Sequence, residues 1–377
     1  MKRAALLLLT GSIPALALPT MIRLGYPNCV SCHVTPQGGG LLNEYGRGID
    51  QAQSWRGGEY QPVSWGALDF LTIGGRVSQD VRGLYSTQLS RTNGGPWLDI
   101  NRGRFFYRNV TTLPRGFRFS AVVDGETDPI VRPARTYDPA VRPGAAMVLS
   151  AMVSYRPKDG IEFGVGRDTL PQGLIIPDQT TYIKARNRFG YYDVPTQAKA
   201  FFWGKRWLVT PFAFLPSGRE PHLGRESGGG AIAEFDLLGH GRTVVGVNAL
   251  HGTSRIGDRT MTGAYTRLGF GSWGVLAEHD FTQRHLTPAL GGVEFGQQAS
   301  YLQAFRYVKE WLITSAIVER LSVEKPYAEH LWALKSEVSA RISSNWTVGL
   351  RAGAQRDFQT GRLSPVASLQ LAMKTVR

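Results

Sequence analysis

The chain has little cysteine, no long apolar run beyond its N-terminal stretch, and no tract of clustered charge. Cys29 and Cys32 are the only two cysteines in 377 residues. No other thiol is therefore present to pair with them or to complete a four-ligand zinc site. The absence of an 18-residue apolar run after the N-terminal stretch excludes helical membrane spans. The formal net charge is +14, but the basic residues are dispersed, which argues against nucleic-acid binding.

The two cysteines stand in the sequence Cys29-Val30-Ser31-Cys32-His33, the attachment signature of a c-type haem. Each thiol can add across one vinyl group of the porphyrin, and the adjoining histidine becomes the proximal iron ligand. The alternative, a redox-active Cys-x-x-Cys pair, favours a βαβ setting that the surrounding sequence does not show. We therefore predict one covalent haem c bound by Cys29 and Cys32, with His33 as the metal ligand and no catalytic residues.

The N-terminal residues have the pattern of a secretory signal peptide. Lys2 and Arg3 precede the apolar run 4–9, and Ala15-Leu16-Ala17 forms a small-x-small cleavage site. A transmembrane anchor would need about 20 apolar residues, and this run is shorter. Export agrees with the haem motif, because c-type haem is attached after export. We predict a signal peptide over 1–17 and a haem-binding segment over 18–66.

Residues 67–377 read as one strand after another. Apolar side chains alternate with polar or small ones in segments of about ten residues, as in 345–356 and 363–374, and period two is the signature of a strand. The predicted strands cover 67–78, 103–112, 115–125, 145–156, 161–169, 197–204, 207–215, 229–238, 242–252, 261–270, 272–282, 297–308, 310–321, 330–341, 345–356 and 363–374.

The predicted connections alternate between long loops and tight turns. The long ones fall at 79–102, 126–144, 170–196, 216–228, 253–260, 283–296, 322–329 and 357–362. Outer-membrane barrels have short periplasmic turns and longer extracellular loops. We therefore predict an all-β fold: a transmembrane outer-membrane β-barrel of about 16 strands over 67–377. Its haem segment then lies on the periplasmic side or within the lumen. The chain does not end in an aromatic residue, which leaves the register of the closing strand open.

The sequence offers no obvious second axial ligand for the iron. No His or Met occurs between Val34 and Gly66, and within the haem segment only Met21 is available. The barrel candidates are His251, His279 and His330, with His222, His240 and His285 in turns or loops. The alternation places the first two on the lipid face. The distal ligand is therefore left unassigned: it is Met21, it comes from the barrel, or the sixth position is open.

Several other side chains have both a functional and a purely structural interpretation. The run Gly38–Gly40 permits close approach of backbone to a flat ring. Arg23 and Arg47 either pair with haem propionates or are solvated. Tyr26, Tyr45 and Trp55 pack either on the porphyrin or on the protein.

Acidic side chains are expected in the lumen, where they would suit a ferrous substrate. Glu278 and Asp280 alternate with an apolar face and should point inward, and Asp124 and Glu126 lie at the outer end of the third strand. Carboxylates are ligands for hard cations, but porin lumens are polar in any case. The loop 170–196 either folds inward as a constriction or covers the outside.

A signal peptide, an N-terminal Cys29–His33 haem motif and a single barrel in one chain resemble the fused monohaem cytochrome–porins of iron-oxidising bacteria. The resemblance implies that extracellular Fe(II) reduces the haem, which passes the electron to a periplasmic c-type cytochrome, with outer-membrane lipid around the barrel. The lead-in Tyr26-Pro27-Asn28 and the run Gly38–Gly40 are not assigned to that family, so another donor or reversed electron flow stays open. Two alternatives remain: a diffusion porin with a haem-bearing plug or redox gate, and a haem enzyme with an open sixth position.

Overall fold

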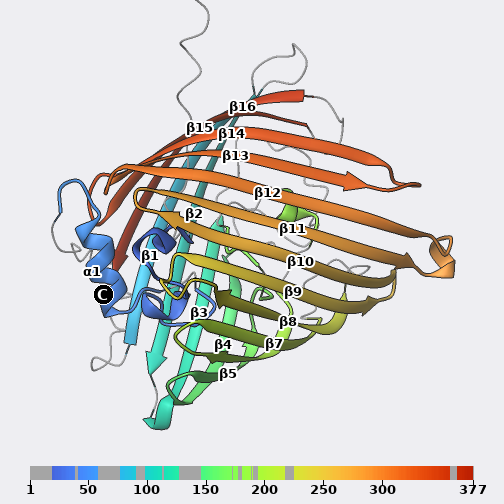
Figure 1. Cartoon of the computed structure of the whole chain (residues 1–377), viewed down its shortest axis with the longest axis horizontal. Coiled ribbons are helices and arrows are strands. Elements are labelled where there is room, and N and C mark those ends of the chain that lie inside the picture. Colours follow the sequence, from blue (N-terminus) through green and yellow to red (C-terminus); the bar gives the residue numbers. More distant parts are fainter. Residues whose placement is uncertain are drawn as a thin grey trace, which may run out of the picture.

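The computed structural model is a closed β-barrel with a short N-terminal segment at one end (Figure 1). It describes residues 19–38, 41–57, 77–90, 98–112, 114–126, 146–171, 173–176, 181–187, 189, 194–216, 225–356 and 363–376. The predicted signal peptide, residues 1–17, lies outside this range. None of the helices in the described ranges is long and apolar enough to cross a membrane.

Sixteen strands run through the described residues, and each pairs in antiparallel fashion with its neighbours in sequence. The barrel closes where β1 pairs with β16, from Asp80 opposite Val376 to Ser90 opposite Val366. The strands are β1 (Val77–Ser90), β2 (Leu98–Thr112), β3 (Phe117–Glu126), β4 (Ala146–Lys158), β5 (Ile161–Arg167), β6 (Thr196–Trp203), β7 (Trp207–Leu215), β8 (Glu226–Asp236), β9 (Thr243–Ser254), β10 (Gly257–Phe270), β11 (Trp273–Leu286), β12 (Glu294–Lys309), β13 (Leu312–Val323), β14 (Glu329–Arg341), β15 (Trp346–Arg356) and β16 (Leu363–Val376).

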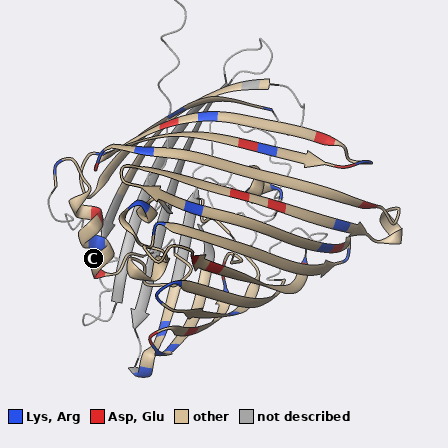
Figure 2. Ribbon diagram, in the orientation of Figure 1, with Lys and Arg blue, Asp and Glu red and all other residues tan. Residues whose placement is uncertain are grey.

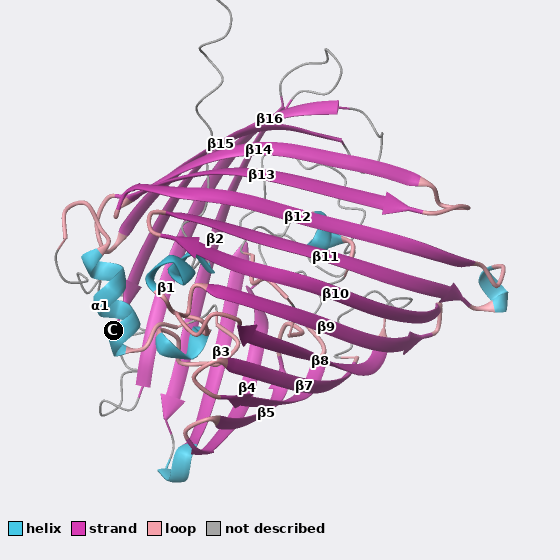
Figure 3. Cartoon of the chain, viewed as in Figure 1, coloured by secondary structure: helices cyan, strands magenta, loops and turns pink. Residues whose placement is uncertain are grey.

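Helical structure is sparse and lies in the N-terminal segment, in turns and in one loop (Figure 3). The N-terminal segment contains η1 (Pro19–Leu24), η2 (Cys29–Ser31) and α1 (Glu44–Ala52). The remaining pieces are η4 (Pro114–Gly116), α2 (Tyr182–Ala185) and η6 (Pro288–Leu290).

The two faces of the strands differ as the alternation predicts. In β14, Trp332 and Leu334 are exposed on the outside, whereas Leu331, Lys335 and Glu337 are buried on the inside. An apolar outer face with a polar inner face is the reverse of a soluble protein and matches a barrel surrounded by lipid. Exposed aromatic side chains on the outer face gather where strands meet the short turns: Phe117, Trp207, Phe235, Phe270, Trp273 and Trp346.

The predicted all-β barrel of about 16 strands is confirmed, with two corrections to its parts. The first strand is Val77–Ser90, not 67–78, and residues 67–76 lie outside the described ranges together with the predicted boundary at 66. The sequence 77–90 carries polar residues at both alternating sets of positions, which weakens its period. The strand forms because both neighbours, β2 and β16, hydrogen-bond to it.

The second correction concerns the predicted long loop 253–260. Only Arg255 and Ile256 separate β9 from β10, and the pairing of the two strands continues to Ser254 opposite Gly257. Gly257 has a φ of +136°, and a Cβ there would lie 1.8 Å from the carbonyl oxygen of His285. The glycine therefore lets the strand start next to the turn, a feature that the alternation does not reveal.

Candidate functional site

The Cys29–His33 sequence forms a single tight turn. The backbone N–H groups of Cys32 and His33 both donate to the carbonyl oxygen of Cys29, at 3.2 and 2.9 Å. Side chains three residues apart on a 3₁₀ turn lie on the same side, so this conformation turns both thiols the same way. Both cysteines are free. The sequence motif therefore adopts a local fold that suits attachment to a single flat group.

The residues after the turn fold back across it and lead into α1. Val34 N–H donates to the carbonyl of Leu41, and Asn43 N–H donates to the carbonyl of Cys32 at 2.9 Å. The side chain of Asn43 accepts from Gly46 N–H at 2.8 Å as the cap of α1, and its amide donates to the carbonyl of Ser31. One side chain thus ties the start of the helix to the haem-motif turn.

Two glycines allow this close packing. A Cβ on Gly46 would lie 2.2 Å from the carbonyl oxygen of Cys32, and a Cβ on Gly38 would lie 2.6 Å from the sulfur of Cys29. Gly38 also has a φ of +76°, which L side chains rarely adopt. Gly38 thus has the positive φ that the glycine run predicts and lies against the cysteine sulfur, whereas the predicted approach to a flat ring stays a prediction; residues 39–40 lie outside the described ranges.

Burial controls the chemistry of the two thiols in the haem-free chain. It raises the pKa of Cys29 to about 11, although the guanidinium of Arg267 beside it acts in the opposite direction. Burial also raises the pKa of Cys32. Both thiols are therefore protonated at neutral pH, and neither resembles the low-pKa thiol of a redox-active pair.

The N-terminal segment docks on the end of the barrel that carries the short turns. Arg23 forms an ion pair with Glu310 and lies over the ring of Tyr307, 3.8 Å from its centroid. At the far end of the segment, Trp55 stacks on Trp311 with ring centroids 5.3 Å apart. Glu310 and Trp311 form the short turn between β12 and β13, so the segment lies at the short-turn end of the barrel (Figure 1).

Side chains of the barrel hold the residues on each side of the motif. Arg118 of β3 donates to the carbonyl of Val34 at 2.7 Å, and Arg156 of β4 donates to the same oxygen at 3.4 Å. Both guanidinium groups also bind the buried carboxylate of Glu162. Arg267 of β10 donates to the carbonyl of Pro27 at 2.8 Å. Strands on several sides of the barrel therefore fix the position of the turn.

The other side chains proposed around the haem have partners within the protein. Arg23 is buried and pairs with Glu310, so it is not a solvated charge, while its pairing with a propionate stays a prediction; Trp55 packs on Trp311. Tyr26 and Tyr45 share a hydroxyl–hydroxyl hydrogen bond, which is the largest cause that raises the pKa of Tyr26 to about 12. Arg47 is half-buried on α1.

The candidates for a second axial ligand are also placed. The sulfur of Met21 accepts a hydrogen bond from Gln53 at 3.8 Å. Three barrel histidines are exposed on the outer face, where each bonds a hydroxyl of the neighbouring strand: His251 to Thr260, His279 to Ser300 and His330 to Ser322. The lipid-facing position predicted for the first two is thus confirmed. His240 is exposed in the β8–β9 turn, His285 pairs with Glu294, and His222 lies outside the described ranges.

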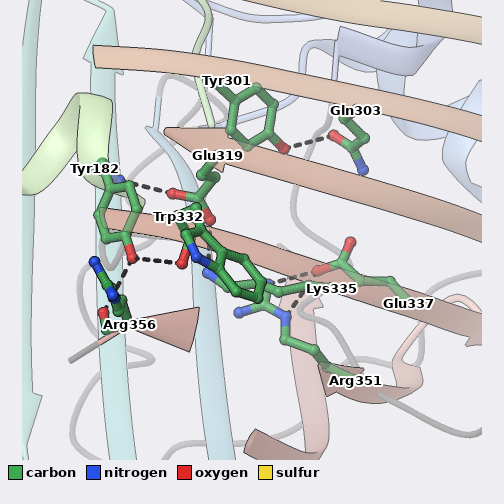
Figure 4. Close-up of polar contacts among 9 residues, drawn as sticks. All are labelled: Tyr182, Tyr301, Gln303, Glu319, Trp332, Lys335, Glu337, Arg351 and Arg356. Atoms are coloured by element: carbon green, nitrogen blue, oxygen red, sulfur yellow. Dashed lines mark hydrogen bonds and ion pairs between the residues drawn. The ribbon is translucent and has the colours of Figure 1, made fainter. Parts of the chain in front are cut away.

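The described parts of the loop between β5 and β6 fold into the lumen, which decides between the two predictions for 170–196. Leu174, Ile183 and Asn187 are almost completely buried. The loop crosses to the opposite wall, where the N–H of Tyr182 donates to Glu319 at 2.7 Å (Figure 4). The hydroxyl of Tyr182 donates to the carbonyls of Trp332 and Arg356. Apolar residues of this loop share one buried cluster with Ile22 of η1.

The predicted inward direction of Glu278 and Asp280 is confirmed, but their oxygens anchor the loop. Glu278 accepts the N–H of Leu174 at 2.8 Å, and Asp280 accepts the amide of Asn187 at 2.8 Å. No group of three metal-binding side chains occurs among the described residues. The structure therefore supplies a structural reason for these carboxylates. Asp124 and Glu126 lie near the end of β3 as predicted, and their side chains fall outside the described features.

A second polar cluster lines the wall that receives the loop. Lys335 binds Glu319 at 2.6 Å, and Arg351 pairs with Glu337 (Figure 4). Sequence analysis missed these residues, because inward-facing charges are common in any barrel lumen. Only the tertiary contact with Tyr182 shows that the Glu319 carboxylate holds the loop. The pattern gave no clear signal, since the inward faces of the same two strands also carry Ser315, Ser339 and Arg341.

Together these features define, in the residues that the structure describes, a porin-type barrel with an inward loop and an N-terminal segment at its short-turn end. The fold is similar to that of a loop-deleted OmpT of Vibrio cholerae, with a TM-score of 0.57 and 10% identity, covering 79% of this chain and 99% of that one. OprB of Pseudomonas putida gives a TM-score of 0.57 at 10% identity, over 79% and 93% of the two chains. An anion-selective porin from Comamonas acidovorans gives 0.53 at 11% identity, over 80% and 100%. No family model matches the sequence, and no curated protein matches it.

Proposed function

We propose that this chain is an outer-membrane electron-transfer protein of the fused monohaem cytochrome–porin type. It would bind a single covalent haem c through Cys29 and Cys32, with His33 as the iron ligand. The observation that carries the proposal is that the Cys29–His33 turn is folded and held at the mouth of a porin-type barrel. The barrel supplies the insulated passage, and the N-terminal segment places the redox site at one end of it.

The residues present fit a c-type haem. Two free thiols lie on one turn with a histidine directly after them, which is the donor set that such a group needs. Gly38 and Gly46 keep side chains away from the sulfur of Cys29 and the backbone of Cys32. A haem c bound there supplies reversible one-electron chemistry. The protein residues hold the turn, exclude water from the thiols and fix the end of the barrel at which the exchange occurs.

The outer face supports a location in the outer membrane. Large apolar side chains are exposed there, and aromatic residues ring the short-turn end, as expected at a membrane interface. We assign the short turns to the periplasm, which places the Cys29–His33 turn on that side. The donor would then be extracellular Fe(II) or another reductant, and the acceptor a periplasmic c-type cytochrome. Export of electrons to an extracellular acceptor uses the same site in reverse.

A channel is the second candidate, and the similarity to solved porins favours it. One of these neighbours is named as anion-selective, and this chain has a formal net charge of +14. In this alternative the N-terminal segment is a plug or a redox gate. The buried loop held by Glu319 and Glu278 argues for a narrow lumen, because it fills part of the interior with apolar side chains.

The first test is covalent haem attachment in cells that contain the c-type haem attachment machinery. The denatured wild-type chain should retain haem and show a haem c spectrum, and the Cys29→Ala/Cys32→Ala variant should retain none. A matched control, Ser31→Ala, changes the same turn and should keep the haem. A wild-type chain without covalent haem would refute the cofactor assignment.

The second test separates electron transfer from solute flow. Vesicles that contain the protein and an enclosed acceptor cytochrome receive Fe(II) on the outside. Reduction of the enclosed cytochrome that requires Cys29 and Cys32 supports electron transfer. Uptake of small anions at equal rates in the oxidised and reduced states, with no reduction inside, would support a plain channel instead. Uptake that changes with redox state would support the gated porin.

A further inference from the structure

The short-turn end of the protein differs in charge from the opposite end (Figure 2). Among the described residues of the N-terminal segment, the short turns and the strand ends next to them, the exposed cations are Arg56, Arg115, Lys158, Lys205, Arg206, Arg242 and Lys309. Its exposed acidic side chains are Glu44, Asp159 and Glu310, and the last is already paired with Arg23.

The opposite end is nearly balanced in the part that the structure describes. Its exposed cations are Arg225, Arg255, Lys325 and Arg356, and its exposed acidic side chains are Asp258, Glu294 and Glu324. Among the described residues, the basic excess is therefore greater at the short-turn end. Insertion in a membrane does not by itself require the two ends to differ in charge, because both ends face water.

Exposed apolar side chains lie among these cations, next to the haem-motif turn. Leu24 is 40% exposed, Tyr45 is 53% exposed and Trp55 is 56% exposed. The neighbouring β8–β9 turn adds Leu238, which is 63% exposed. This turn touches the segment directly, since a Cβ on Gly241 would lie 2.0 Å from the carbonyl oxygen of Gly25. The apolar side chains and the turn thus lie at the same end of the barrel.

The haem-motif turn is close to this face. Tyr26, three residues before Cys29, contacts Tyr45 edge-on with ring centroids 6.0 Å apart. A partner that covers the Tyr26–Tyr45 pair would therefore approach the turn within a few side chains. A protein with a single redox centre can exchange electrons only with a partner that comes close to that centre.

We propose that this short-turn face docks a soluble electron-carrier protein with an acidic contact surface. The inference rests on the proposed electron-transfer function and names the charge of the partner. A small apolar centre with a charged rim suits a transient complex, because the charges steer the encounter while the contact area stays small. The basic cations attract an acidic partner and repel a basic one.

The experiment compares two probes of the same fold. Cytochrome c with succinylated lysines is acidic, and the unmodified protein is basic. Each is labelled with a fluorophore and titrated against the protein in discs of zwitterionic lipid at low and high salt. We expect the acidic probe to bind at low salt, to weaken as salt increases, and to exceed the binding of the basic probe.

Charge reversal then locates the surface. The triple variant Lys205→Glu/Arg242→Glu/Lys309→Glu should weaken binding of the acidic probe by about tenfold or more at low salt. The matched control Arg225→Glu/Arg255→Glu/Lys325→Glu makes the same change in charge at the other end and should leave binding unchanged. The proposal would be overturned if both triple variants weakened binding of the acidic probe equally, or if the acidic and basic probes bound equally well. Folding of each variant is checked by the gel mobility of the unheated barrel.

Two further arms keep the outcomes apart. The haem-free variant Cys29→Ser/Cys32→Ser should still bind the acidic probe, so that docking can stand even if electron transfer fails. If haem is present and the probes bind equally, docking fails and the proposed function survives. Discs of anionic lipid test the membrane as the alternative occupant. If the charge-reversal variant changes the interaction with anionic lipid but not the binding of the acidic probe, the face contacts lipid and the proposal is wrong.

Discussion

Two glycines in α1 give a sharp prediction, because they differ in surroundings while sharing one helix. Gly46 faces Cys32, where a Cβ would lie 2.2 Å from the carbonyl oxygen, whereas a Cβ on Gly48 would meet nothing within 4 Å. Replacing Gly by Ala inside a helix stabilises it by about 1 kcal/mol when nothing opposes the change. We expect that gain in full for Gly48→Ala.

For Gly46→Ala the same gain is opposed by a steric cost. The contact must open by about 1 Å to reach an ordinary separation, and forcing extra atoms into a packed site costs about 1–3 kcal/mol. The obstacle is backbone, which cannot rotate away. The variant should therefore be less stable than wild type by about 0–2 kcal/mol, and less stable than Gly48→Ala by about 1–3 kcal/mol.

The measurement is hydrogen exchange of the α1 amides in detergent, followed by mass spectrometry. The ratio of exchange rates gives the local free energy of opening. Peptides from β10 and β11 serve as the internal control and should exchange alike in all three proteins. If Gly46→Ala protects α1 as well as Gly48→Ala does, the helix does not pack on the Cys29–His33 turn, and the account of the site is wrong.

Three further predictions test the thiols, the loop and the docking of the segment. In the haem-free Cys32→Ser variant at pH 8, alkylation of Cys29 should be about a hundredfold slower than for a solvent-exposed thiol with the ordinary pKa of 9.0, because burial raises the pKa of Cys29 to about 11. The alkylation rate should rise with pH up to about pH 11. A rate that levels off near pH 9 would contradict this prediction. Lys335→Met leaves the Glu319 carboxylate buried without its cation, so we expect about 3–5 kcal/mol of local destabilisation and larger ion currents in planar bilayers as the loop loosens; unchanged currents would show that Glu319 does not hold it. Trp55→Ala removes a stacked pair that contributes about 0.5–1.5 kcal/mol beyond burial, and should speed proteolysis near residue 55; a cleavage rate equal to wild type would refute the docking.

The architecture could be predicted because a barrel repeats one local rule many times. Each strand must show an apolar face to lipid, and the period of two survives in segments such as β14 and β15. The rule failed where a segment is stabilised by its neighbours, as in β1, or where one glycine removes a loop, as at Gly257. Pairing partners and backbone conformation are not encoded in hydrophobicity.

The candidate site was only partly predictable. The spacing of Cys29, Cys32 and His33 predicts covalent haem attachment from five residues, and the structure shows that these five residues form one turn. The partners of Arg23 and Trp55 could not be predicted, because Glu310 and Trp311 lie more than 250 residues away in the sequence. The lumen role of Glu278 was also ambiguous, since a carboxylate that binds a cation and one that accepts a backbone N–H look the same in sequence.

The sequence by itself determined the barrel and its number of strands, and it predicts haem attachment at Cys29–His33, because each depends on residue type at short, regular spacing. Only the tertiary structure decided that the loop after β5 enters the lumen and that the N-terminal segment covers the short-turn mouth. Those outcomes depend on contacts between distant residues, such as Tyr182 with Glu319 and Arg118 with Val34. Such contacts are selected by the shape and charge of the whole barrel interior, which no local pattern records.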